Sequence, residues 1–239
     1  MCKQSLKGYS IKCMHMQEKQ TIVFLGATGA VGSIAFHHLL SSNKVSRILT
    51  LGRRAVDVKE PPAYLEQKLI DIHHPSSYAD EIRNCNIAIC TLGVGEPSKV
   101  SKADFIAIDK TAVLNFAKIC KENGVKQFHL LSSVGSSSRS RNYYLRTKGE
   151  LEDELARMDF DRLSIFHPSM IMTPQNRYGF TQALALFIWP KLDIFLHGGA
   201  RKYRGIKVDM LGKSIANNVF IDKQGVEYLR YDDFLKLQG

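Results

Sequence analysis

Tyr144 and Lys148 form a pair suited to acid–base chemistry. Side chains four residues apart lie on the same face of a helix, one turn from each other. A nearby ammonium lowers the pKa of a phenol, normally about 10, so that the phenol can exchange a proton at neutral pH. The same spacing occurs twice more, at Tyr64/Lys68 and Tyr203/Lys207. The first of these falls in a predicted strand and the second in a glycine-flanked basic loop, so only Tyr144 and Lys148 are predicted to share a helical face.

A serine hydroxyl precedes this helix in the sequence. The predicted strand Gln127–Ser132 is followed at once by Ser133, and the helix predicted over Tyr143–Met158 carries Tyr144. Ligand sites in open α/β sheets gather at the carboxyl ends of strands. Ser133 is therefore placed to donate a hydrogen bond to a substrate carbonyl while Tyr144 transfers the proton. The alternative interpretation is an ordinary serine-rich turn.

A glycine-rich turn connects the first predicted strand, Thr21–Leu25, with a helix predicted over Val31–Leu40. In its sequence, GATGAVG, Gly26 permits a tight turn, Gly29 lets the backbone approach a pyrophosphate, and Gly32 lets the helix pack close to the strand. The helix N-terminus also offers free N–H groups and the positive end of its dipole to phosphates. A glycine triplet alone is a weak signal, but its position between the first strand and the first helix is the context that dinucleotide binding requires.

Two arginines follow the second predicted strand, Arg47–Leu51. An enzyme that selects NAD usually has an acidic residue there, which binds the ribose 2′-hydroxyl. Arg53 and Arg54 are instead suited to bidentate binding of a 2′-phosphate, which favours NADP(H) over NAD(H) as the cofactor. The alternative for both arginines is a solvated loop. Asp71, at the end of the third predicted strand, could accept a hydrogen bond from the adenine amino group or could cap a turn.

Apolar, strand-like runs alternate with helical stretches along the chain. The predicted strands are Thr21–Leu25, Arg47–Leu51, Leu65–Ile72, Ile87–Leu92, Gln127–Ser132 and Arg162–Phe166. The predicted helices are Val31–Leu40, Ser76–Arg83, Asp104–Asn123, Tyr143–Met158 and one around Leu211–Ile221, with a short strand at Ile206–Val208 and a final strand–helix pair at Glu227–Leu237. Near-continuous apolar strands separated by helices are typical of a parallel sheet covered on both faces. The sequence therefore predicts an α/β fold with a doubly wound parallel sheet, in one domain over residues 19–239 after an N-terminal tail over residues 1–18.

Four motifs occur in an order that is typical of a known family. GATGAVG, the Thr91–Gly93 run TLG, LLSSVG and YLRTK follow one another as in the short-chain dehydrogenases/reductases. Over residues 20–235 the chain most resembles the atypical branch that includes the HIV Tat-interacting oxidoreductase and its bacterial relatives. This resemblance implies a Rossmann fold with NADPH, in which Ser133 polarises the substrate, Tyr144 is the acid/base and Lys148 holds the nicotinamide ribose. The implied cofactor site comprises Gly26, Thr28, Gly29, Ala30, Val31, Gly32, Arg53, Arg54, Asp71, Ile72, Thr91, Leu92, Gly93, Tyr144, Lys148 and Pro168.

The chain also departs from the family pattern. Thr91-Leu92-Gly93-Val94 replaces the Asn-Asn-Ala-Gly of the larger branch, Asp109 stands where many extended members have Asn, and His167-Pro168-Ser169 replaces Arg-Pro-Gly. The predicted function is an NADPH-dependent oxidoreductase acting on a small carbonyl or alcohol substrate. The alternatives are a non-catalytic, NADPH-binding regulatory or scaffold protein, and an NAD(P)-dependent epimerase or dehydratase with a nucleotide-sugar-like substrate.

Composition and charge narrow the class of protein. Apolar residues make up 44% of the chain and charged residues 23%, which is ordinary globular composition and excludes a wholly disordered chain. The five cysteines are an odd number without a CxxC pair, so we expect reduced thiols, a cytoplasmic location and no structural zinc site. The formal net charge of +10 favours polyanions in general. Because no zinc-finger spacing or RNP-type strand motif accompanies this charge, we expect no nucleic-acid partner.

Two pairs of adjacent histidines, His37/His38 and His73/His74, raise the question of a metal site. Adjacent side chains on a helix point about 100° apart and seldom bind one ion together. No cysteine or carboxylate framework accompanies either pair, so we expect no metal ligand among them.

An aromatic-rich segment, Phe180–Leu196, follows the sixth predicted strand. No run of 18 apolar residues occurs in the chain, so no transmembrane segment is predicted. Short-chain reductases build their substrate loop at this position, and we assign residues 174–205 to that role. Phe187 and Trp189 would then select an apolar or aromatic carbonyl compound. A helix in peripheral contact with a membrane surface is the alternative, and a homo-oligomer is compatible with the sequence.

Overall fold

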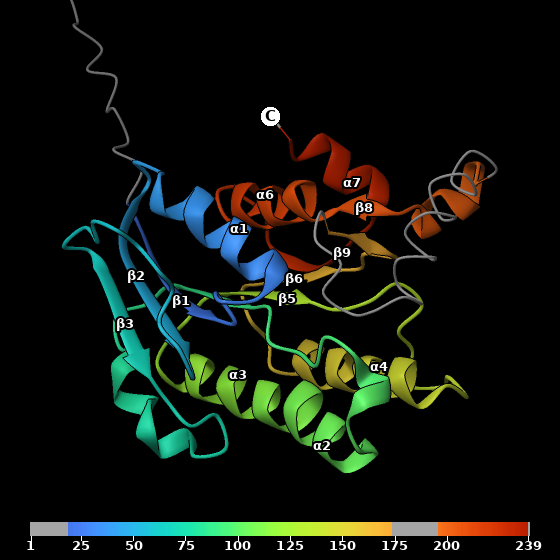
Figure 1. The fold of residues 1–239 in the computed structure, drawn as a ribbon, viewed down its shortest axis with the longest axis horizontal. Coiled ribbons are helices and arrows are strands. Elements are labelled where there is room, and N and C mark those ends of the chain that lie inside the picture. Colours follow the sequence, from blue (N-terminus) through green and yellow to red (C-terminus); the bar gives the residue numbers. More distant parts are fainter. Residues whose placement is uncertain (1–18, 174–195, 239) are drawn as a thin grey trace, which may run out of the picture.

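The centre of the molecule is a seven-stranded sheet in which all neighbouring strands are parallel (Figure 1). The computed structural model describes residues 19–173 and 196–238. The order across the sheet is β3-β2-β1-β4-β5-β6-β9. The strands are β1 (Gln20–Leu25), β2 (Val45–Gly52), β3 (Leu65–Leu69), β4 (Ile87–Cys90), β5 (Gln127–Leu131), β6 (Arg162–Phe166) and β9 (Gly225–Leu229). The strand order reverses between β1 and β4, which makes their carboxyl ends the topological switch point of the sheet.

Helices cover both faces of the sheet (Figure 1). On one face lie α1 (Ala30–Leu40), α6 (Val208–Asn218) and α7 (Tyr231–Lys236), and on the other lie α2 (Lys102–Ile106), α3 (Val113–Glu122) and α4 (Tyr143–Ala156). Alternate residues of β1 enter the two cores. Ile22 and Phe24 pack with residues of α1 and α6, whereas Val23 and Leu25 pack with residues of α3 and α4. The predicted α/β fold with a doubly wound parallel sheet is confirmed, and it is a Rossmann-like single domain.

The helix predicted over Asp104–Asn123 is divided into three segments. Helix α2 ends at Ile106, a π-helical turn, η4, spans Ala107–Ala112, and α3 begins at Val113. A π-helical turn widens the helix locally, and such turns frequently occur at functional sites. This one carries the buried carboxylate of Asp109.

The prediction of a helix over Ser76–Arg83 is wrong. The chain there forms two short 3-10 turns, η1 (Pro75–Ser77) and η2 (Ala79–Ile82). Tyr78 separates them because its φ of −135° lies outside the helical region, and its ring is fully buried in the core. The preceding strand, β3, is also shorter than predicted.

A second, two-stranded parallel sheet joins β7 (Ile171–Met172) and β8 (Ile206–Lys207). This pairing was not predicted from the sequence. A 3-10 turn, η6 (Gly198–Tyr203), precedes β8, and α6 follows it directly. The small sheet therefore begins five residues after the end of β6, just beyond the carboxyl end of that strand.

A buried ion pair joins the last two strands of the main sheet. The Arg162 side chain is 1% exposed, and its Nη2 donates to Oε1 of Glu227 at 2.7 Å and to Oδ1 of Asn218 at 2.9 Å. Burial opposes the charged form of Glu227, but hydrogen bonds from Lys223, Ser164 and Arg162 outweigh it and hold the pKa of Glu227 at about 2. The carboxylate is therefore ionised at neutral pH and fixes β9 to β6.

His129 on β5 is expected to limit the stability of the protein in acid. It is fully buried, neither ring nitrogen has a hydrogen-bond partner in the described part of the chain, and desolvation lowers its pKa to about 3. The unfolded chain, with a histidine pKa of about 6.5, binds more protons below that pH, so this contribution to stability is lost as the pH falls from about 6.5 to about 3.

The variant His129→Leu removes this dependence and two unpaired polar atoms. We expect it to be more stable than the unmodified protein, and we expect its advantage to grow by about 2 kcal/mol between pH 7 and pH 5. Urea unfolding at the two pH values measures both quantities. An advantage that is the same at pH 7 and pH 5 would mean that His129 is not kept neutral by burial.

Candidate active site

Two glycines where β1 passes into α1, one in the turn and one in the first turn of the helix, have no room for a side chain. Gly26 has a φ of +95°, and a Cβ there would lie 2.6 Å from the backbone nitrogen of Leu92. A Cβ on Gly32 would lie 2.2 Å from the carbonyl oxygen of Gly26. Helix α1 therefore begins directly against the end of β1, and its first turn borders a cavity. A helix N-terminus with an unobstructed backbone fits the pyrophosphate of a dinucleotide.

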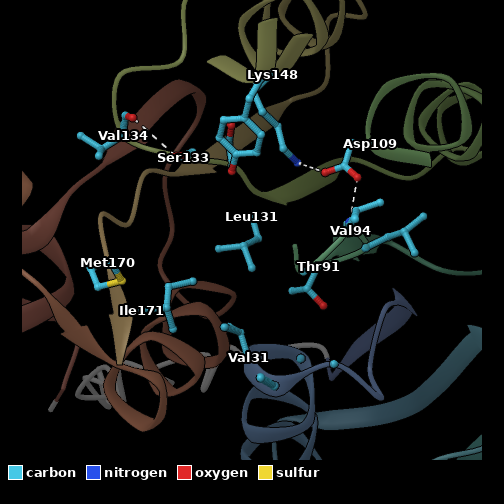
Figure 2. A pocket seen from close by; sticks show the side chains of 18 of the residues that line it. Val31, Thr91, Val94, Asp109, Leu131, Ser133, Val134, Lys148, Met170 and Ile171 are labelled. Atoms are coloured by element: carbon cyan, nitrogen blue, oxygen red, sulfur yellow. Dashed lines mark hydrogen bonds and ion pairs between the residues drawn. The ribbon is translucent and has the colours of Figure 1, made fainter. Parts of the chain in front are cut away.

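This cavity, of about 500 Å³, opens at the carboxyl ends of β1, β4 and β5 (Figure 2). It lies at the topological switch point, where open α/β sheets bind their ligands. Val31 of α1 lies at one side of it, Met170 and Ile171 lie at a second side, and Lys148 with Asp109 closes a third (Figure 2). The cavity thus joins the glycine turn, the π-helical turn, α4 and the segment around β7.

The loop after β4 is hydrogen-bonded to the glycine turn on one side and to the π-helical turn on the other. Thr91 Oγ1 donates to the carbonyl oxygen of Gly26 at 3.0 Å, and the Val94 N–H donates to Oδ2 of Asp109 at 2.7 Å. Thr91, Leu92 and Gly93 line the cavity between these two anchor points. The structure therefore places this predicted cofactor-binding run beside the glycine turn.

Lys148 is held by a buried carboxylate. Its Nζ lies 2.8 Å from Oδ1 of Asp109, and the two side chains are 5% and 2% exposed. Burial opposes the ammonium form, but Asp109 and the nearby phenol of Tyr144 outweigh it, so the pKa of Lys148 is raised. Lys148 is therefore charged at neutral pH, as a residue that binds a ribose hydroxyl or supports a phenolate must be.

Tyr144 lies in the first turn of α4 and lines the same cavity as Lys148. Its ring packs against the fully buried ring of Phe105, with centroids 5.4 Å apart. The neighbouring Tyr143 packs edge-on against Phe105, and its hydroxyl lies 3.5 Å from the carbonyl oxygen of Pro97, away from the cavity lining. The structure thus distinguishes the two adjacent tyrosines by position.

The other two Tyr-x-x-x-Lys pairs lie outside this cavity. Tyr64 precedes β3 and donates to the carbonyl oxygen of Leu40 at 2.6 Å, and Lys68 pairs with Glu81 at the surface. Tyr203 ends the 3-10 turn η6. Neither pair shares a helical face, as the sequence context predicted.

The two serines at the end of β5 have different surroundings. Both serines line the cavity, but the Ser133 hydroxyl makes only a marginal contact of 3.5 Å with the Val134 carbonyl oxygen, so it is available to a ligand. The Ser132 hydroxyl donates instead to the buried carboxylate of Glu152. Of the two, Ser133 is the one whose hydroxyl could reach a substrate oxygen together with Tyr144.

The predicted phosphate-binding arginines are exposed. Arg53 and Arg54 follow β2, and no hydrogen bond or ion pair engages their guanidinium groups within residues 19–173 and 196–238. Asp71 caps a turn, as one of its two interpretations predicted. Its carboxylate accepts from the backbone of His73 at 2.9 Å and lies 2.8 Å from Nδ1 of His74, and these two hydrogen bonds lower the pKa of Asp71.

Besides Gly26, three further predicted cofactor residues do not line the cavity. The Ile72 side chain lies in the core that packs against α3. Pro168 is buried, and its carbonyl oxygen accepts the Val134 N–H at 2.9 Å. Thr28 is exposed on the glycine turn. A role for these three in binding the cofactor stays a prediction.

Sequence reasoning missed the buried polar residues around the site. It noted Asp109 and His167 only as departures from a family pattern, and it did not single out Ser132 or Glu152. A signal for Glu152 was present, because it follows Lys148 by the same four residues that separate Lys148 from Tyr144. No cluster of three histidine, cysteine, aspartate or glutamate side chains suited to a metal ion occurs in the described ranges.

Some predictions concern residues that the structure does not describe. The N-terminal tail over residues 1–18 lies outside the described residues, as do Phe187, Trp189 and most of the 174–205 region. Within the part that is described, no helix is long and apolar enough to cross a membrane.

Comparison with known proteins identifies a family model that spans the site, and individual relatives. The NAD(P)H-binding family matches residues 26–186. Protein HTATIP2 of Rattus norvegicus is 33% identical over 159 residues, which are 66% of this chain and 64% of the rat protein. The match therefore spans less than two thirds of the rat protein. Protein FMP52, mitochondrial, of Candida albicans is 31% identical over 225 residues, 89% of this chain and 96% of the fungal protein.

A solved structure shows the same fold at low identity. MoeE5 in complex with UDP-glucuronic acid and NAD has a TM-score of 0.67 to this chain and 15% sequence identity. The similarity covers 87% of this chain and 75% of that one. At this identity the likeness is one of fold alone.

The predicted cytoplasmic location is contradicted by these relatives. The related FMP52 proteins of Candida albicans, Meyerozyma guilliermondii and Emericella nidulans are all named as mitochondrial. The prediction depended on the cysteines, whose odd number and spacing give no indication of disulfide bonds. Such cysteines indicate reducing surroundings, and they do not distinguish the cytosol from another reducing compartment.

Proposed function

Since this chain belongs to the NAD(P)H-binding family, we propose that it is an NADPH-dependent oxidoreductase of the short-chain dehydrogenase/reductase type. Its substrate in this proposal is a small carbonyl or alcohol compound. The observation that carries the proposal is the meeting of Ser133, Tyr144 and Lys148 in one cavity beside the N-terminus of α1. A hydroxyl, a phenol and a charged amine at that point are the groups that carbonyl reduction needs.

Each of the three side chains has a separate part in the reaction. When bound, the nicotinamide supplies a hydride to the carbonyl carbon, or accepts one from an alcohol in the reverse direction. Tyr144 donates its phenolic proton to the carbonyl oxygen, and Ser133 donates a hydrogen bond to the same oxygen. Lys148, kept charged by Asp109, stabilises the phenolate that remains on Tyr144.

The described walls of the cavity offer apolar contacts to a small substrate. Val94, Val134, Met170 and Ile171 present apolar surface, and Lys148 is the only cationic side chain among the lining residues that the structure describes. This apolar surface is suited to the hydrocarbon part of a carbonyl or alcohol compound.

A substrate panel tests the proposed function. The purified protein is mixed with NADPH and small aldehydes, ketones or quinones, and the loss of NADPH absorbance is followed. Sustained oxidation of NADPH with formation of the alcohol supports the proposal. Conversion of a sugar nucleotide without net change in the cofactor would instead identify an epimerase. Cofactor-dependent binding of a protein partner, with no turnover of any carbonyl, would identify a regulatory protein.

Cofactor choice gives a second test, through Arg53. We expect the protein to bind NADPH more tightly than NADH, because the exposed guanidinium of Arg53 can pair with the 2′-phosphate. Loss of a charge-assisted contact costs about 1.5–3 kcal/mol, so Arg53→Ala should weaken NADPH binding roughly tenfold or more and leave NADH binding unchanged. Titration of both cofactors by fluorescence or calorimetry measures the preference.

Arg157→Ala is the matched control for this titration. Arg157 is an exposed arginine at the opposite end of α4 from Tyr144, and it pairs only weakly with Glu154, at 3.7 Å. Its replacement changes the net charge by the same amount but should leave both affinities as they were. Equal affinities of the unmodified protein for NADPH and NADH would refute the role of Arg53.

A further inference from the structure

Three buried polar side chains lie next to the cavity and have no part in the reaction described above. They are Ser132 at the end of β5, Glu152 on α4 and His167 at the end of β6, and each is at most 7% exposed. The Ser132 hydroxyl donates to Oε1 of Glu152, and Nε2 of His167 lies 2.9 Å from the same oxygen. Burying a carboxylate costs free energy unless it gains partners, and this one gains two from different strands.

Glu152 shares a helical face with two of the site residues. Tyr144, Lys148 and Glu152 follow one another at intervals of four residues on α4, so their side chains lie in a row along the helix. The first two reach the cavity. Glu152, one turn further, reaches between the ends of β5 and β6.

The partners of Glu152 lie in the two loops that follow β5 and β6. Ser132 comes before Ser133, the proposed donor to the substrate oxygen, and His167 comes before Pro168. Backbone hydrogen bonds join these two loops to each other, from Ser132 to Phe166 and from Val134 to Pro168, both at 2.9 Å. The two loops are therefore one unit, and Glu152 binds this unit to the helix that carries Tyr144.

A backbone hydrogen bond also joins the loop after Ser133 to α4. It runs from the Ser137 N–H to the carbonyl oxygen of Leu145, at 3.1 Å. This bond lies on the far side of Ser133 from Ser132. Ser133 thus lies between attachments to α4 on both sides along the chain, and the Ser132–Glu152 hydrogen bond is the buried one next to it.

We propose that Glu152 is a positioning residue, whose carboxylate holds the Ser133 hydroxyl where it and the Tyr144 phenol can reach the same substrate oxygen. This inference depends on the proposed function, because it assigns a purpose to the distance between two proposed reacting groups. Small displacements of such groups lower rates severely, since a shift of about 1 Å can cost roughly 100-fold. Because Ser132 and Ser133 are adjacent, an acceptor that fixes the position of Ser132 also fixes the backbone that carries the Ser133 hydroxyl.

A double-mutant cycle with Ser133 tests the proposal. Glu152→Met removes the acceptor at similar volume, and we expect it to lower kcat roughly tenfold to 100-fold in the otherwise unmodified protein. In a Ser133→Ala background the same change should have little further effect, because the hydroxyl that Glu152 positions is gone. Glu152→Gln keeps an oxygen that can accept from Ser132, so it should retain most of the activity. A merely structural role predicts the same fold loss in both backgrounds.

Two further variants make the result decisive. Glu154→Gln changes an exposed carboxylate on the same helix and should leave kcat unchanged in both backgrounds. If Glu152→Met does not fold, Ser132→Ala removes one partner with a smaller change, and it is taken through the same cycle. Equal losses with and without the Ser133 hydroxyl overturn the proposal.

Failure of the proposed function has a separate signature. Tyr144→Phe is assayed beside these variants on the same substrate. If Tyr144→Phe keeps full activity, the assignment of the reacting groups is wrong, and the Glu152 proposal is refuted with it. If Tyr144→Phe loses activity while Glu152→Met acts equally in both backgrounds, the proposed function survives and only the role of Glu152 is refuted.

Discussion

Tyr144→Phe is expected to lower turnover roughly 100-fold or more and to leave the affinity for NADPH nearly unchanged. The change removes one hydroxyl and keeps the ring that packs against Phe105, so α4 and the cavity wall should retain their geometry. The proton donor for the substrate oxygen is lost, whereas the glycine turn and Lys148 remain. Steady-state kinetics on a substrate from the panel gives the turnover, and a cofactor titration gives the affinity.

Tyr143→Phe provides the matched control. Tyr143 is adjacent in sequence and packs against the same Phe105 ring, yet its hydroxyl lies near the Pro97 carbonyl oxygen and outside the cavity lining. The same chemical change at this position should leave turnover unaffected. A Tyr144→Phe protein with full activity on an established substrate would show that another group is the general acid.

Removal of the Asp109 carboxylate is expected to destabilise the cofactor-free protein strongly. In Asp109→Ala, the buried ammonium of Lys148 loses the negative charge that lies 2.8 Å away. Breaking a buried ion pair from one side typically costs about 3–5 kcal/mol, because the remaining charge stays desolvated. Urea unfolding of the unmodified protein and the variant measures the difference in the free energy of unfolding.

A double variant separates loss of the charge from loss of packing. Asp109→Ala with Lys148→Met leaves no unpaired charge, so it should recover most of the lost stability while turnover stays low. The pH dependence gives a second check. Without Asp109, burial lowers the folded-state pKa of Lys148 below its unfolded value of about 10.4, so the stability deficit should shrink as the pH is raised toward that value. A double variant as unstable as Asp109→Ala would contradict this account.

The central strands of the sheet could be predicted from the sequence because they are buried on both faces. The residues of β1 alternate between two cores, so every position from Ile22 to Leu25 must be apolar, and such a run is visible in a single sequence. The glycine turn was recognisable for a similar reason, since a positive φ and a close backbone approach each exclude other residues. Each of these constraints restricts which residue can occupy a single position, so it can be recognised in one sequence.

The parts that could not be predicted depend on residues that are distant in sequence. The π-helical turn at Ala107–Ala112 has no distinct sequence signal, and its purpose is visible only when Asp109 is seen beside Lys148. In the sequence, Glu152 resembles an ordinary surface glutamate on an amphipathic helix. Its burial follows from the meeting of the ends of β5 and β6, and only the folded chain reveals that meeting.

The place of β9 at the edge of the sheet has a consequence for how the chain is made. Strands leave the ribosome in chain order, so β6 is complete long before Gly225–Leu229 is synthesised. During that interval β6 is an open edge, and Arg162 has not met Glu227. An open edge with unpaired N–H and C=O groups is a template for another chain. The nascent protein therefore exposes an edge that can pair with another chain during this interval, and a premature stop before residue 225 would leave β6 uncovered by β9.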